Sequence, residues 1–458
     1  MLRDAVLLGS AQAVSNAWDA RATWAPAGLG ARGAILVGPG DTPLDLIERA
    51  PIWDALDLFP ANGSSIILVD PPADGAAKRA VLTRAAEAGS KAYILNHGKK
   101  LRRLRLDDLI GRPLGEVDFA RIRNVIAGKR VLVTGGGGSI GSELARRIAT
   151  LGPARLTLLD SSEHNLYGIG LELPDAVQVL ADIRDAHAMG RWFATERPEL
   201  VFHAAALKQV PMVEAFPSEG VLTNVLGLQN VAEAARSVGA DLLFVSTDKA
   251  VDPSGAMGAS KRLGEIYCQA LDRAGPQRAV PVRLGNVMGS AGSVTPIFEA
   301  QLADGGPLTV TDPEVTRFFL TIPQAADALL QAAAVGLTAE PRGSVLVIDM
   351  GEALPVVELA REVIRLEGLR PEIDVPITFT GLRPGEKLHE ALIAAGEWRE
   401  ADPAQGVIAV ASEQRDLAEV LSAMAALTAL ARDGANDRIG PALFAAIGGG
   451  ARDEAIAV

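Results

Sequence analysis

A glycine-rich turn between a strand pattern and a helix pattern constrains the fold of this chain more than any other feature. The stretch Lys129-Arg-Val-Leu-Val-Thr134 is typical of a strand, and residues 142–149 have helical periodicity. The turn between them reads Gly135-Gly-Gly-Gly138-Ser-Ile-Gly141. Glycines there let the backbone approach a pyrophosphate, which the unpaired N–H groups of the helix start would bind. We therefore predict a dinucleotide-binding unit whose backbone contacts come from Gly135, Gly138, Ser139, Ile140 and Gly141.

An acidic residue at the end of the next strand pattern indicates which dinucleotide binds. The pattern at 155–159 ends in Asp160, at about the 20-residue distance from the glycine turn at which a carboxylate accepts hydrogen bonds from ribose hydroxyls. The same carboxylate would repel a 2′-phosphate. We therefore predict that the cofactor is NAD rather than NADP.

Two further strand ends are expected to line the same dinucleotide site. The pattern at 177–181 leads into Asp182 and Ile183, where a carboxylate can accept a hydrogen bond from the adenine amino group. The pattern at 200–203 leads into Ala204 and Ala205, whose small side chains let the chain pass close to the nicotinamide half.

Two polar residues nearby are expected to have structural rather than functional roles. His203 alone is more typical of a core histidine than of a ligand, and Asn224, inside a helical pattern, is predicted at the surface.

The polar stretch Ser246-Thr-Asp-Lys249 follows an apolar run at 241–245 that is typical of a buried strand. In an open α/β sheet, ligands bind at the carboxyl ends of the strands. Thr247, Asp248 and Lys249 are therefore predicted to exchange protons with a substrate, and Lys261 falls on the following helix. The alternative interpretation of Asp248-Lys249 is an ion pair on a surface loop.

Composition excludes several classes of protein. The chain has 458 residues and a formal net charge of −12, which argues against an extended nucleic-acid surface. A single cysteine excludes an internal disulfide, and the five histidines have no metal-ligand spacing, so we predict no metal. No stretch approaches the ~18 apolar residues that a spanning helix needs. We therefore predict a cytoplasmic protein with no integral membrane segment.

The order of strand and helix patterns predicts an α/β protein with three parts. Residues 1–115 are expected to form a small α/β domain of degenerate nucleotide-binding type. Residues 116–400 are expected to form a Rossmann-type doubly wound parallel sheet with interleaved segments of a smaller substrate-binding part. Residues 401–458 are alanine-rich and predicted to be a helical carboxyl-terminal segment.

Several motifs of the chain together resemble one family. Besides the glycine turn, Asp182-Ile-Arg-Asp185 and Ser246-Thr-Asp-Lys249, they are His203-Ala-Ala-Ala-Leu-Lys-Gln-Val-Pro-Met-Val-Glu214, Met257-Gly-Ala-Ser-Lys261, Arg283-Leu-Gly-Asn-Val-Met-Gly-Ser290, Thr316-Arg-Phe-Phe319 and Leu382-Arg-Pro-Gly-Glu-Lys387. From 115 to 392, the chain resembles the nucleotide-sugar 4,6-dehydratases of the extended short-chain dehydrogenase/reductase superfamily. The resemblance is to the polysaccharide-biosynthesis branch that acts on UDP-N-acetylglucosamine. Larger members of that branch carry membrane helices before a small α/β domain, and this chain is expected to keep only the small domain.

The resemblance implies a reaction in three steps. C4 of a UDP-sugar is oxidised with hydride transfer to NAD, water is eliminated across C5 and C6, and the hydride returns to C6. It also implies roles for individual residues: Lys249 is the base at C5, Asp248 is the acid for the C6 hydroxyl, Thr247 hydrogen-bonds the C4 hydroxyl, and Lys261 holds the nicotinamide ribose. Contacts with the UDP-sugar are expected from Lys208, Asn286, Arg317, Arg383 and Glu386.

Met257 is the one departure from the superfamily pattern, which usually has a tyrosine four residues before the active-site lysine. Methionine also occurs there in the dehydratase branch, so the departure implies that other residues carry the acid–base chemistry.

Two alternative functions remain open, namely a UDP-sugar 4-epimerase and a catalytically inactive NAD-binding scaffold. The adjacent acid and base, Asp248 and Lys249, favour the dehydratase. We also expect a homo-oligomer, and the sequence does not identify the sugar.

Overall fold

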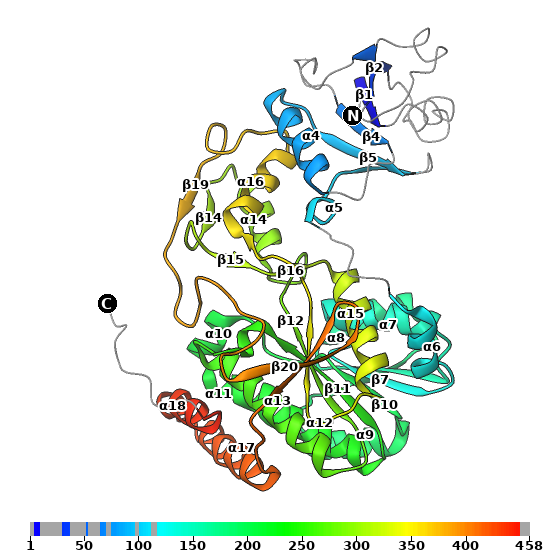
Figure 1. Cartoon of the computed structure of the whole chain (residues 1–458), viewed down its shortest axis with the longest axis vertical. Helices are drawn as coiled ribbons and strands as arrows, with labels where there is room; N and C mark the ends of the chain where they lie inside the picture. The colour runs from blue at the N-terminus through cyan, green and yellow to red at the C-terminus, as the bar shows by residue number, and fades with distance from the viewer. Residues whose placement is uncertain are drawn as a thin grey trace. The chain divides into compact units, whose positions relative to one another are not determined.

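The computed structural model describes residues 4–9, 30–36, 52–53, 65–69, 75–96, 100–110 and 117–448. The chain forms two compact units, and each unit is assembled from three segments (Figure 1). The smaller unit comprises residues 1–112, 294–314 and 354–381, and the larger unit comprises residues 113–293, 315–353 and 382–458. Two later segments therefore return to the unit that contains the amino-terminal residues.

The larger unit is built on a nine-stranded sheet. Its strands, in spatial order, are β20 (Glu397–Ala404), β21 (Val407–Ser412), β17 (Val345–Ile348), β12 (Ala279–Leu284), β11 (Asp241–Thr247), β10 (Leu200–His203), β7 (Arg130–Thr134), β8 (Arg155–Asp160) and β9 (Val177–Leu180). All neighbours from β17 to β9 are parallel. After β9 the chain crosses to the other side of β7, so the strand order reverses between β7 and β10, the position at which such sheets bind ligands. The predicted Rossmann-type doubly wound sheet is confirmed.

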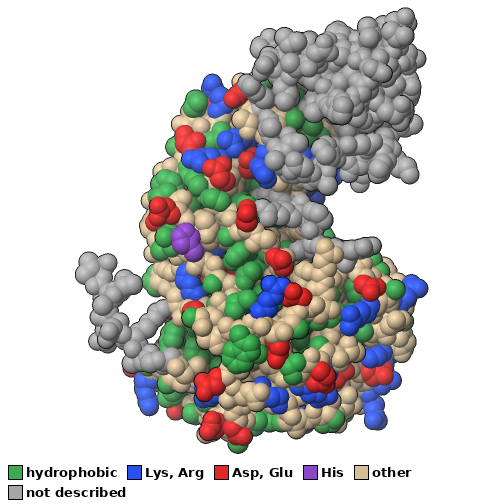
Figure 2. Space-filling model, in the orientation of Figure 1, with side chains coloured by type: hydrophobic (Ala, Val, Ile, Leu, Met, Phe, Trp, Pro, Cys, Tyr) green, Lys and Arg blue, Asp and Glu red, His purple; other side chains and the backbone are tan. Residues whose placement is uncertain are grey.

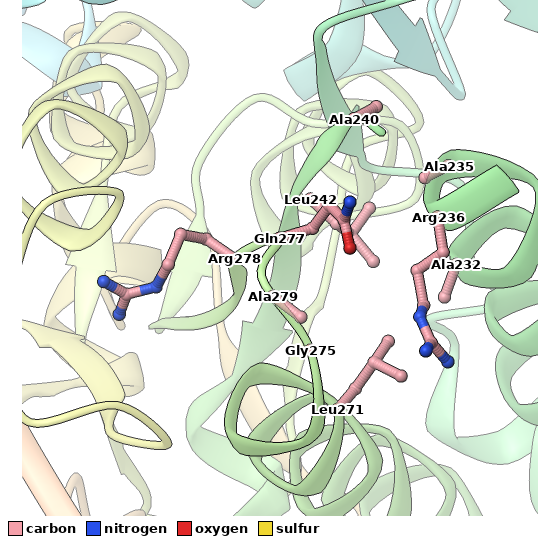
Figure 3. Close-up of a pocket in the computed structure, with 10 residues that line it drawn as sticks. All are labelled: Ala232, Ala235, Arg236, Ala240, Leu242, Leu271, Gly275, Gln277, Arg278 and Ala279. Carbon is pink, nitrogen blue, oxygen red and sulfur yellow. The ribbon is translucent and has the colours of Figure 1, made fainter. Parts of the chain in front are cut away.

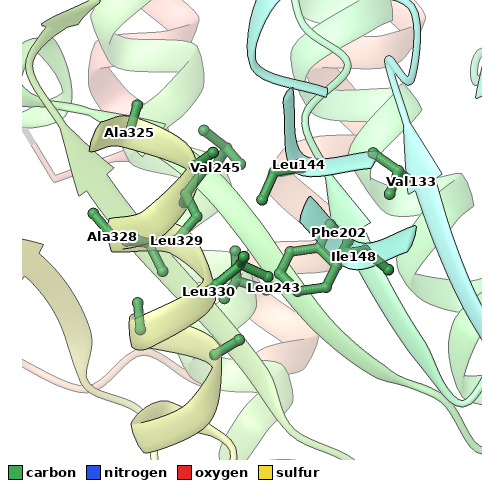
Figure 4. Packing of buried hydrophobic residues seen from close by; sticks show 14 of the residues in the cluster. Val133, Leu144, Ile148, Phe202, Leu243, Val245, Ala325, Ala328, Leu329 and Leu330 are labelled. Atoms are coloured by element: carbon green, nitrogen blue, oxygen red, sulfur yellow. The ribbon is translucent and has the colours of Figure 1, made fainter. Parts of the chain in front are cut away.

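Helices cover both faces of this sheet because side chains alternate along each strand. Leu243 and Val245 of β11 belong to one core, and Leu242 and Phe244 to the other. The first core, shown in Figure 4, packs under α6 (Phe119–Ile126), α7 (Ser139–Thr150), α8 (Glu163–Glu172) and α15 (Ile322–Gly336). The second packs under α9 (Ala186–Glu196), α12 (Gly227–Ser237), α13 (Ala256–Ala274), α17 (Leu417–Arg432) and α18 (Asn436–Ala446).

Short elements of the larger unit connect these layers near the carboxyl ends of the strands. They are α10 (Val210–Ala215), α11 (Pro217–Gly220), the π-helix η2 (Val221–Leu226), the 3₁₀ turn η3 (Asp248–Ala250), β13 (Asn286–Val287), β15 (Thr316–Arg317) and β16 (Phe319–Leu320). β13 pairs in parallel with β16.

The prediction of a helical segment from residue 401 onward is wrong for its first part. Residues up to 412 lie in the antiparallel hairpin β20–β21, which adds to the sheet edge at β17, and the helix begins only at Leu417. The physical reason is burial, since Val407 and Val410 are buried and pair with β17. A high alanine content favours a helix only where no strand edge offers such pairing.

The smaller unit contains a six-stranded sheet. Its spatial order is β3 (Ile52–Trp53), β2 (Gly30–Leu36), β1 (Asp4–Gly9), β4 (Ser65–Val69), β5 (Ala92–Asn96) and β6 (Lys100–Arg103). Only β6 runs antiparallel to its neighbour among these strands. The other elements in the described part of this unit are α4 (Gly75–Glu87), α5 (Leu106–Ile110), α14 (Val294–Ala303), β14 (Leu308–Val310), β18 (Leu354–Pro355), α16 (Val356–Leu366) and β19 (Ile377–Phe379). α16 packs against α4 and α5, so a late segment of the chain covers an early one.

Candidate active site

The glycine turn joins β7 to α7 as tightly as the sequence predicts. Gly135 has φ +66°, and a Cβ there would lie 2.7 Å from the backbone nitrogen of Ala205. A Cβ on Gly141 would lie 2.0 Å from the carbonyl oxygen of Gly135, so only glycine fits at either position. α7 begins at Ser139, and the first N–H groups of a helix have no acceptor inside it. Ser139, Ile140 and Gly141 therefore offer donors, and the turn fits a pyrophosphate.

Asp160, at the end of β8, is hydrogen-bonded to the backbone of the glycine turn. Its Oδ2 accepts from the backbone N–H of Gly137 at 3.0 Å, and its Oδ1 accepts from the N–H of Ser162 at 2.9 Å. A carboxylate has about four acceptor positions. Asp160 therefore keeps acceptor capacity for a ribose hydroxyl, and that contact stays a prediction.

Asp182 and Ile183 follow β9 and have opposite environments. The Asp182 carboxylate accepts from the backbone N–H of Arg184 at 2.9 Å and from its Nε at 2.8 Å. Burial would raise the pKa of Asp182, but the hydrogen bonds from Arg184 outweigh it and hold that pKa below its usual range. Ile183 is buried against α12, where a Cβ on Gly227 would lie 2.6 Å from its Cδ1.

Ala204 and Ala205 follow β10 and lie alongside the glycine turn. The backbone N–H of Ala204 donates to the carbonyl oxygen of Thr134.

The structure brings Thr247, Asp248 and Lys249 together at the carboxyl end of β11. The Thr247 hydroxyl donates to Asp248 Oδ1 at 2.9 Å, and Lys249 Nζ donates to the same oxygen at 3.0 Å. Lys249 Nζ also donates to Asn286 Oδ1 at 2.9 Å. The Asp248 side chain is fully buried, and its Oδ2 has no hydrogen-bond partner within the described part of the chain. Thr247 and Lys249 therefore share one oxygen atom of Asp248, a geometry that permits direct proton transfer between Lys249 and Asp248.

A residue that the sequence reasoning missed, Glu390, lies beside this pair. Its Oε1 is 3.5 Å from Lys249 Nζ and 3.8 Å from Arg317 Nε. Its Oε2 is 3.7 Å from Lys387 Nζ. Glu390 lies just beyond the Leu382–Lys387 motif, and no local pattern connects it with Lys249. The tertiary fold alone brings the two residues together.

Arg317 has a different set of partners from the diphosphate that we expected. Its Nη1 donates to the carbonyl oxygens of Thr316 at 2.7 Å and Leu388 at 3.0 Å, and its Nη2 donates to the carbonyl oxygen of Lys387 at 2.7 Å. Three of the five guanidinium N–H donors are therefore used within the chain. Arg317 fixes the segment that carries Glu390, and a diphosphate contact stays a prediction.

The other predicted substrate contacts lie on two loops. Arg383 is exposed, and it forms a turn with Glu386 in which the backbone N–H of Arg383 donates to the Glu386 carboxylate at 3.2 Å. Lys208 is exposed as a whole residue, its Nζ donates to the Ser290 hydroxyl at 3.1 Å, and partial burial of the amine lowers its pKa. The loop of Ser290 also meets the glycine turn, because the N–H of Ala291 donates to the hydroxyl of Ser139 at 3.1 Å.

Met257 and Lys261 lie on the first turns of α13 and face the buried side of the site. Met257 is 3% exposed and has no ionisable group in the position that usually holds a tyrosine. Lys261 Nζ donates to the carbonyl oxygen of Val245 at 2.6 Å and lies 4.2 Å from the centre of the Phe244 ring. Burial lowers the pKa of Lys261 to about 8, although the nearby Glu265 carboxylate opposes this shift.

Asn224 is buried, contrary to the surface position predicted for it. Its Oδ1 accepts from the N–H of Leu207 at 2.9 Å, and its Nδ2 donates to the carbonyl oxygen of Leu207 and to the hydroxyl of Ser260, each at 3.0 Å. A signal was present in the sequence, since Asn224 shares a helical face with the apolar residues Val221 and Leu228. Asn224 therefore fastens the 204–208 segment to α13.

His203 is a satisfied core histidine, as its pattern indicates. Its Nδ1 lies 2.7 Å from the Thr134 hydroxyl, and its ring stacks on Phe244 with 5.9 Å between ring centres. Burial, together with the charge of Lys261, lowers the pKa of His203 to about 3. The ring is therefore neutral at physiological pH.

A small hollow lies elsewhere in the larger unit. Figure 3 shows a small hollow at the opposite ends of β11 and β12, where mostly apolar side chains such as Ala232, Leu242 and Leu271 gather. Across the described ranges, no group of His, Cys, Asp or Glu side chains has the arrangement of a metal site. No helix in these ranges is long and apolar enough to cross a membrane. Figure 2 shows acidic and basic side chains mixed over the visible face.

The sheet order, the glycine turn and the polar cluster at the end of β11 define an enzyme fold of the extended short-chain dehydrogenase/reductase class. Residues 131–412 match the family described as polysaccharide biosynthesis protein, and the chain belongs to that family. The resemblance inferred from the motifs is therefore confirmed at the level of the family.

Three known proteins illustrate the relationship. The capsular polysaccharide biosynthesis protein CapD of Staphylococcus aureus is 42% identical over 306 residues, which are 65% of this chain and 50% of CapD. UDP-glucose 4-epimerase of Rickettsia akari is 34% identical over 63% of this chain and 84% of that protein. A DesIV double mutant, a dTDP-glucose 4,6-dehydratase of Streptomyces venezuelae solved with NAD bound, has a TM-score of 0.50 and 26% identity over 57% of this chain and 87% of that chain. The present chain thus spans half the length of CapD.

Proposed function

We propose that this protein is an NAD-dependent 4,6-dehydratase of UDP-N-acetylglucosamine or a close UDP-hexose, acting in the synthesis of polysaccharide precursors. The observation that carries the proposal is the shared oxygen of Asp248, which is hydrogen-bonded by both Thr247 and Lys249. Elimination of water needs a base at one carbon and an acid at the next. The contacts of Asp248 and Lys249 support these two roles. A cytoplasmic location and a homo-oligomer stay predictions.

Proton transfer between Lys249 and Asp248 prepares the elimination. When a proton moves from Lys249 Nζ to Asp248 Oδ1 over 3.0 Å, an amine and a carboxylic acid result. The amine then takes the C5 hydrogen as a proton, the C5–C6 double bond forms, the C6–O bond breaks, and Asp248 protonates the departing hydroxyl to give water. The ammonium and carboxylate pair is thereby restored. This cycle balances the protons of the elimination step. When the hydride returns to C6, Lys249 gives a proton to C5, and the proton released from the C4 hydroxyl in the oxidation replaces it. Met257 cannot take up that proton.

The dinucleotide would be held by the glycine turn with Ser139, Ile140 and Gly141, by Asp160, and by Lys261. When bound, NAD supplies the hydride acceptor for C4 and the hydride donor for C6, so the reaction has no net redox change. We propose that Lys261 holds the nicotinamide ribose. It is buried below the end of β11, and its pKa of about 8 leaves it largely protonated at neutral pH. Its charge favours the anionic form of groups that lose protons nearby.

A UDP-sugar 4-epimerase is the second candidate, and the identity with the Rickettsia akari epimerase favours it. An epimerase oxidises C4 and returns the hydride to the same carbon, so it needs no acid at C6. Asp248 would then have no chemical role. The buried position of Asp248 and its bond to Lys249 favour the dehydratase.

Incubation of the purified protein with NAD and UDP-N-acetylglucosamine, followed by mass spectrometry and NMR of the nucleotide sugar, tests the proposal. Loss of one water with a ketone at C4 is the expected result. A product of unchanged mass with inverted C4 would favour the epimerase. Unchanged substrate from folded, NAD-bound protein, with UDP-N-acetylglucosamine and with UDP-glucose alike, would refute both.

A further inference from the structure

Glu390 is a buried carboxylate whose position the motifs do not explain. Its side chain is 2% exposed, and Oε1 lies 3.5 Å from Lys249 Nζ. Oε2 is buried and accepts no hydrogen bond from the described residues. Burial of a carboxylate without a full set of hydrogen bonds is unfavourable, so such a group in a native fold calls for an explanation.

Glu390 is surrounded by charged groups from three parts of the larger unit. Lys249 comes from η3, Arg317 from β15, and Lys387 from the loop that carries Glu390 itself. Asp248 is the other carboxylate on the Lys249 amine, and Asn286 is a neutral acceptor. The neighbouring His389 is exposed, and its Nδ1 lies 2.9 Å from the Thr316 hydroxyl.

The loop that carries Glu390 is fastened to the segment that carries Lys249. Lys387 Nζ donates to the carbonyl oxygen of Val251 at 2.5 Å, and the Ser254 hydroxyl donates to the carbonyl oxygen of Gly385 at 2.6 Å. Arg317 holds the backbone of residues 387 and 388 from the other side. The distance between Glu390 and Lys249 is therefore fixed by several independent contacts.

The Lys249 ammonium carries three hydrogens, and three oxygen atoms lie around it. Asp248 Oδ1 and Asn286 Oδ1 accept two of these hydrogens at 3.0 and 2.9 Å. Glu390 Oε1, at 3.5 Å, is the third oxygen and lies within reach of a charged contact. Without Glu390, the third direction around the amine has no fixed acceptor, and Nζ can rotate away from a substrate carbon.

We propose that Glu390 is the positioning residue for Lys249. Its carboxylate fixes the direction of the amine, and its negative charge faces the ammonium at 3.5 Å. The inference rests on the proposed function, because it deepens the role of Lys249 as the base. A carboxylate near an ammonium favours the charged form, so removal of the Glu390 charge should let Lys249 react as a neutral amine at lower pH.

The first test measures the reactivity of Lys249 without substrate or cofactor. The full-length protein and Glu390→Gln are acetylated with a trace of acetic anhydride at a series of pH values, and the peptide with Lys249 is quantified by mass spectrometry. The amide keeps the size of the side chain and one acceptor oxygen but removes the charge. Removal of an opposite charge at this distance should move the pH midpoint of acetylation down by about one unit.

Glu362→Gln is the matched control. Glu362 lies on α16 of the smaller unit, is buried with one oxygen lacking a hydrogen-bond partner in the described chain, and pairs with Arg365 at 3.1 Å. The Glu362→Gln variant should leave the pH midpoint of Lys249 acetylation unchanged. A midpoint in Glu390→Gln equal to that of the wild type, or an equal shift in Glu362→Gln, would overturn the inference. Should Glu390→Gln not fold, Glu390→Asp withdraws the carboxylate by one methylene and should lower the midpoint by a smaller amount, and no shift would again overturn it.

The second test uses turnover. In Glu390→Gln, kcat should fall about 10-fold or more, KM should change less, and the rising limb of the pH profile of kcat should move to lower pH. A purely structural role would lower the amount of folded enzyme and leave the profile in place, which would count against the inference. The two tests also separate the proposals: if no UDP-sugar is converted, the proposed function fails while acetylation still decides whether Glu390 controls Lys249.

Discussion

Replacement of Lys249 by methionine is the most direct test of the proposed chemistry. Methionine has a similar length and no amine, so it removes the donor to Asp248 Oδ1 and Asn286 Oδ1 with little change in volume. Removal of a positioned proton-transfer group lowers the rate by about 10² to 10⁴, which corresponds to about 3 to 5 kcal/mol in the activation free energy. We expect kcat for dehydration to fall by this factor while UDP-sugar binding is largely kept.

The same substitution should have a moderate effect on stability. Among the described residues, it leaves the buried Asp248 carboxylate with the Thr247 hydroxyl alone, whereas Glu390 keeps Arg317 and Lys387. Breaking a fully buried ion pair costs about 3 to 5 kcal/mol, but the Lys249 side chain is 22% exposed, so we expect about 1 to 3 kcal/mol. Chemical denaturation at pH 7 measures this loss.

The isotope content of the product provides the assay for the role of the amine. In D₂O the wild-type enzyme should place solvent deuterium at C5, because the proton on Lys249 exchanges with water, whereas the hydrogen gained at C6 should come from C4. Lys91→Met is the matched control, since Lys91 forms an exposed ion pair with Glu367 in the smaller unit. Near-full activity of Lys249→Met, or a wild-type product without deuterium at C5, would show that another residue is the base.

Three further predictions concern Asp248, Asp160 and the ion pair of Arg283 with Glu397. Asp248→Asn should stop elimination, because an amide cannot protonate the leaving hydroxyl; the product assay should show no loss of water, and full dehydration would contradict the role of Asp248. Wild type should bind NAD more tightly than NADP in calorimetry, and Asp160→Asn should reduce this preference about tenfold by removing a like-charge repulsion; tighter binding of NADP by wild type would refute the assignment. Burial would raise the pKa of Glu397, but two hydrogen bonds from Arg283 lower it to about 2. This carboxylate therefore stabilises the fold fully above about pH 4.5, its ordinary value, and loses that contribution as the pH falls towards 2. Arg283→Met should cost about 3 to 5 kcal/mol at pH 7 and clearly less at pH 3 in denaturant titrations, and an equal loss at both would refute this account.

Local patterns in the sequence predicted the parts of this protein that depend on neighbours along the chain. The glycine turn was predictable because Gly135 and Gly141 are required by contacts within one β–α unit. The position of Thr247, Asp248 and Lys249 was predictable because the carboxyl ends of parallel strands meet at one edge of the sheet. The predicted contacts of these residues with NAD and a UDP-sugar remain to be measured.

Only the tertiary structure decided which distant residues complete the site. Glu390 reaches Lys249 because Arg317, Lys387 and Ser254 fasten one loop to another, and no periodicity records such contacts. The same reason explains why residues 401–412 form strands, since the free edge of β17 overrides their local preference. Sequence by itself therefore determined the sheet, the glycine turn and the cluster of Thr247, Asp248 and Lys249, whereas long-range packing determined how Lys249 is held.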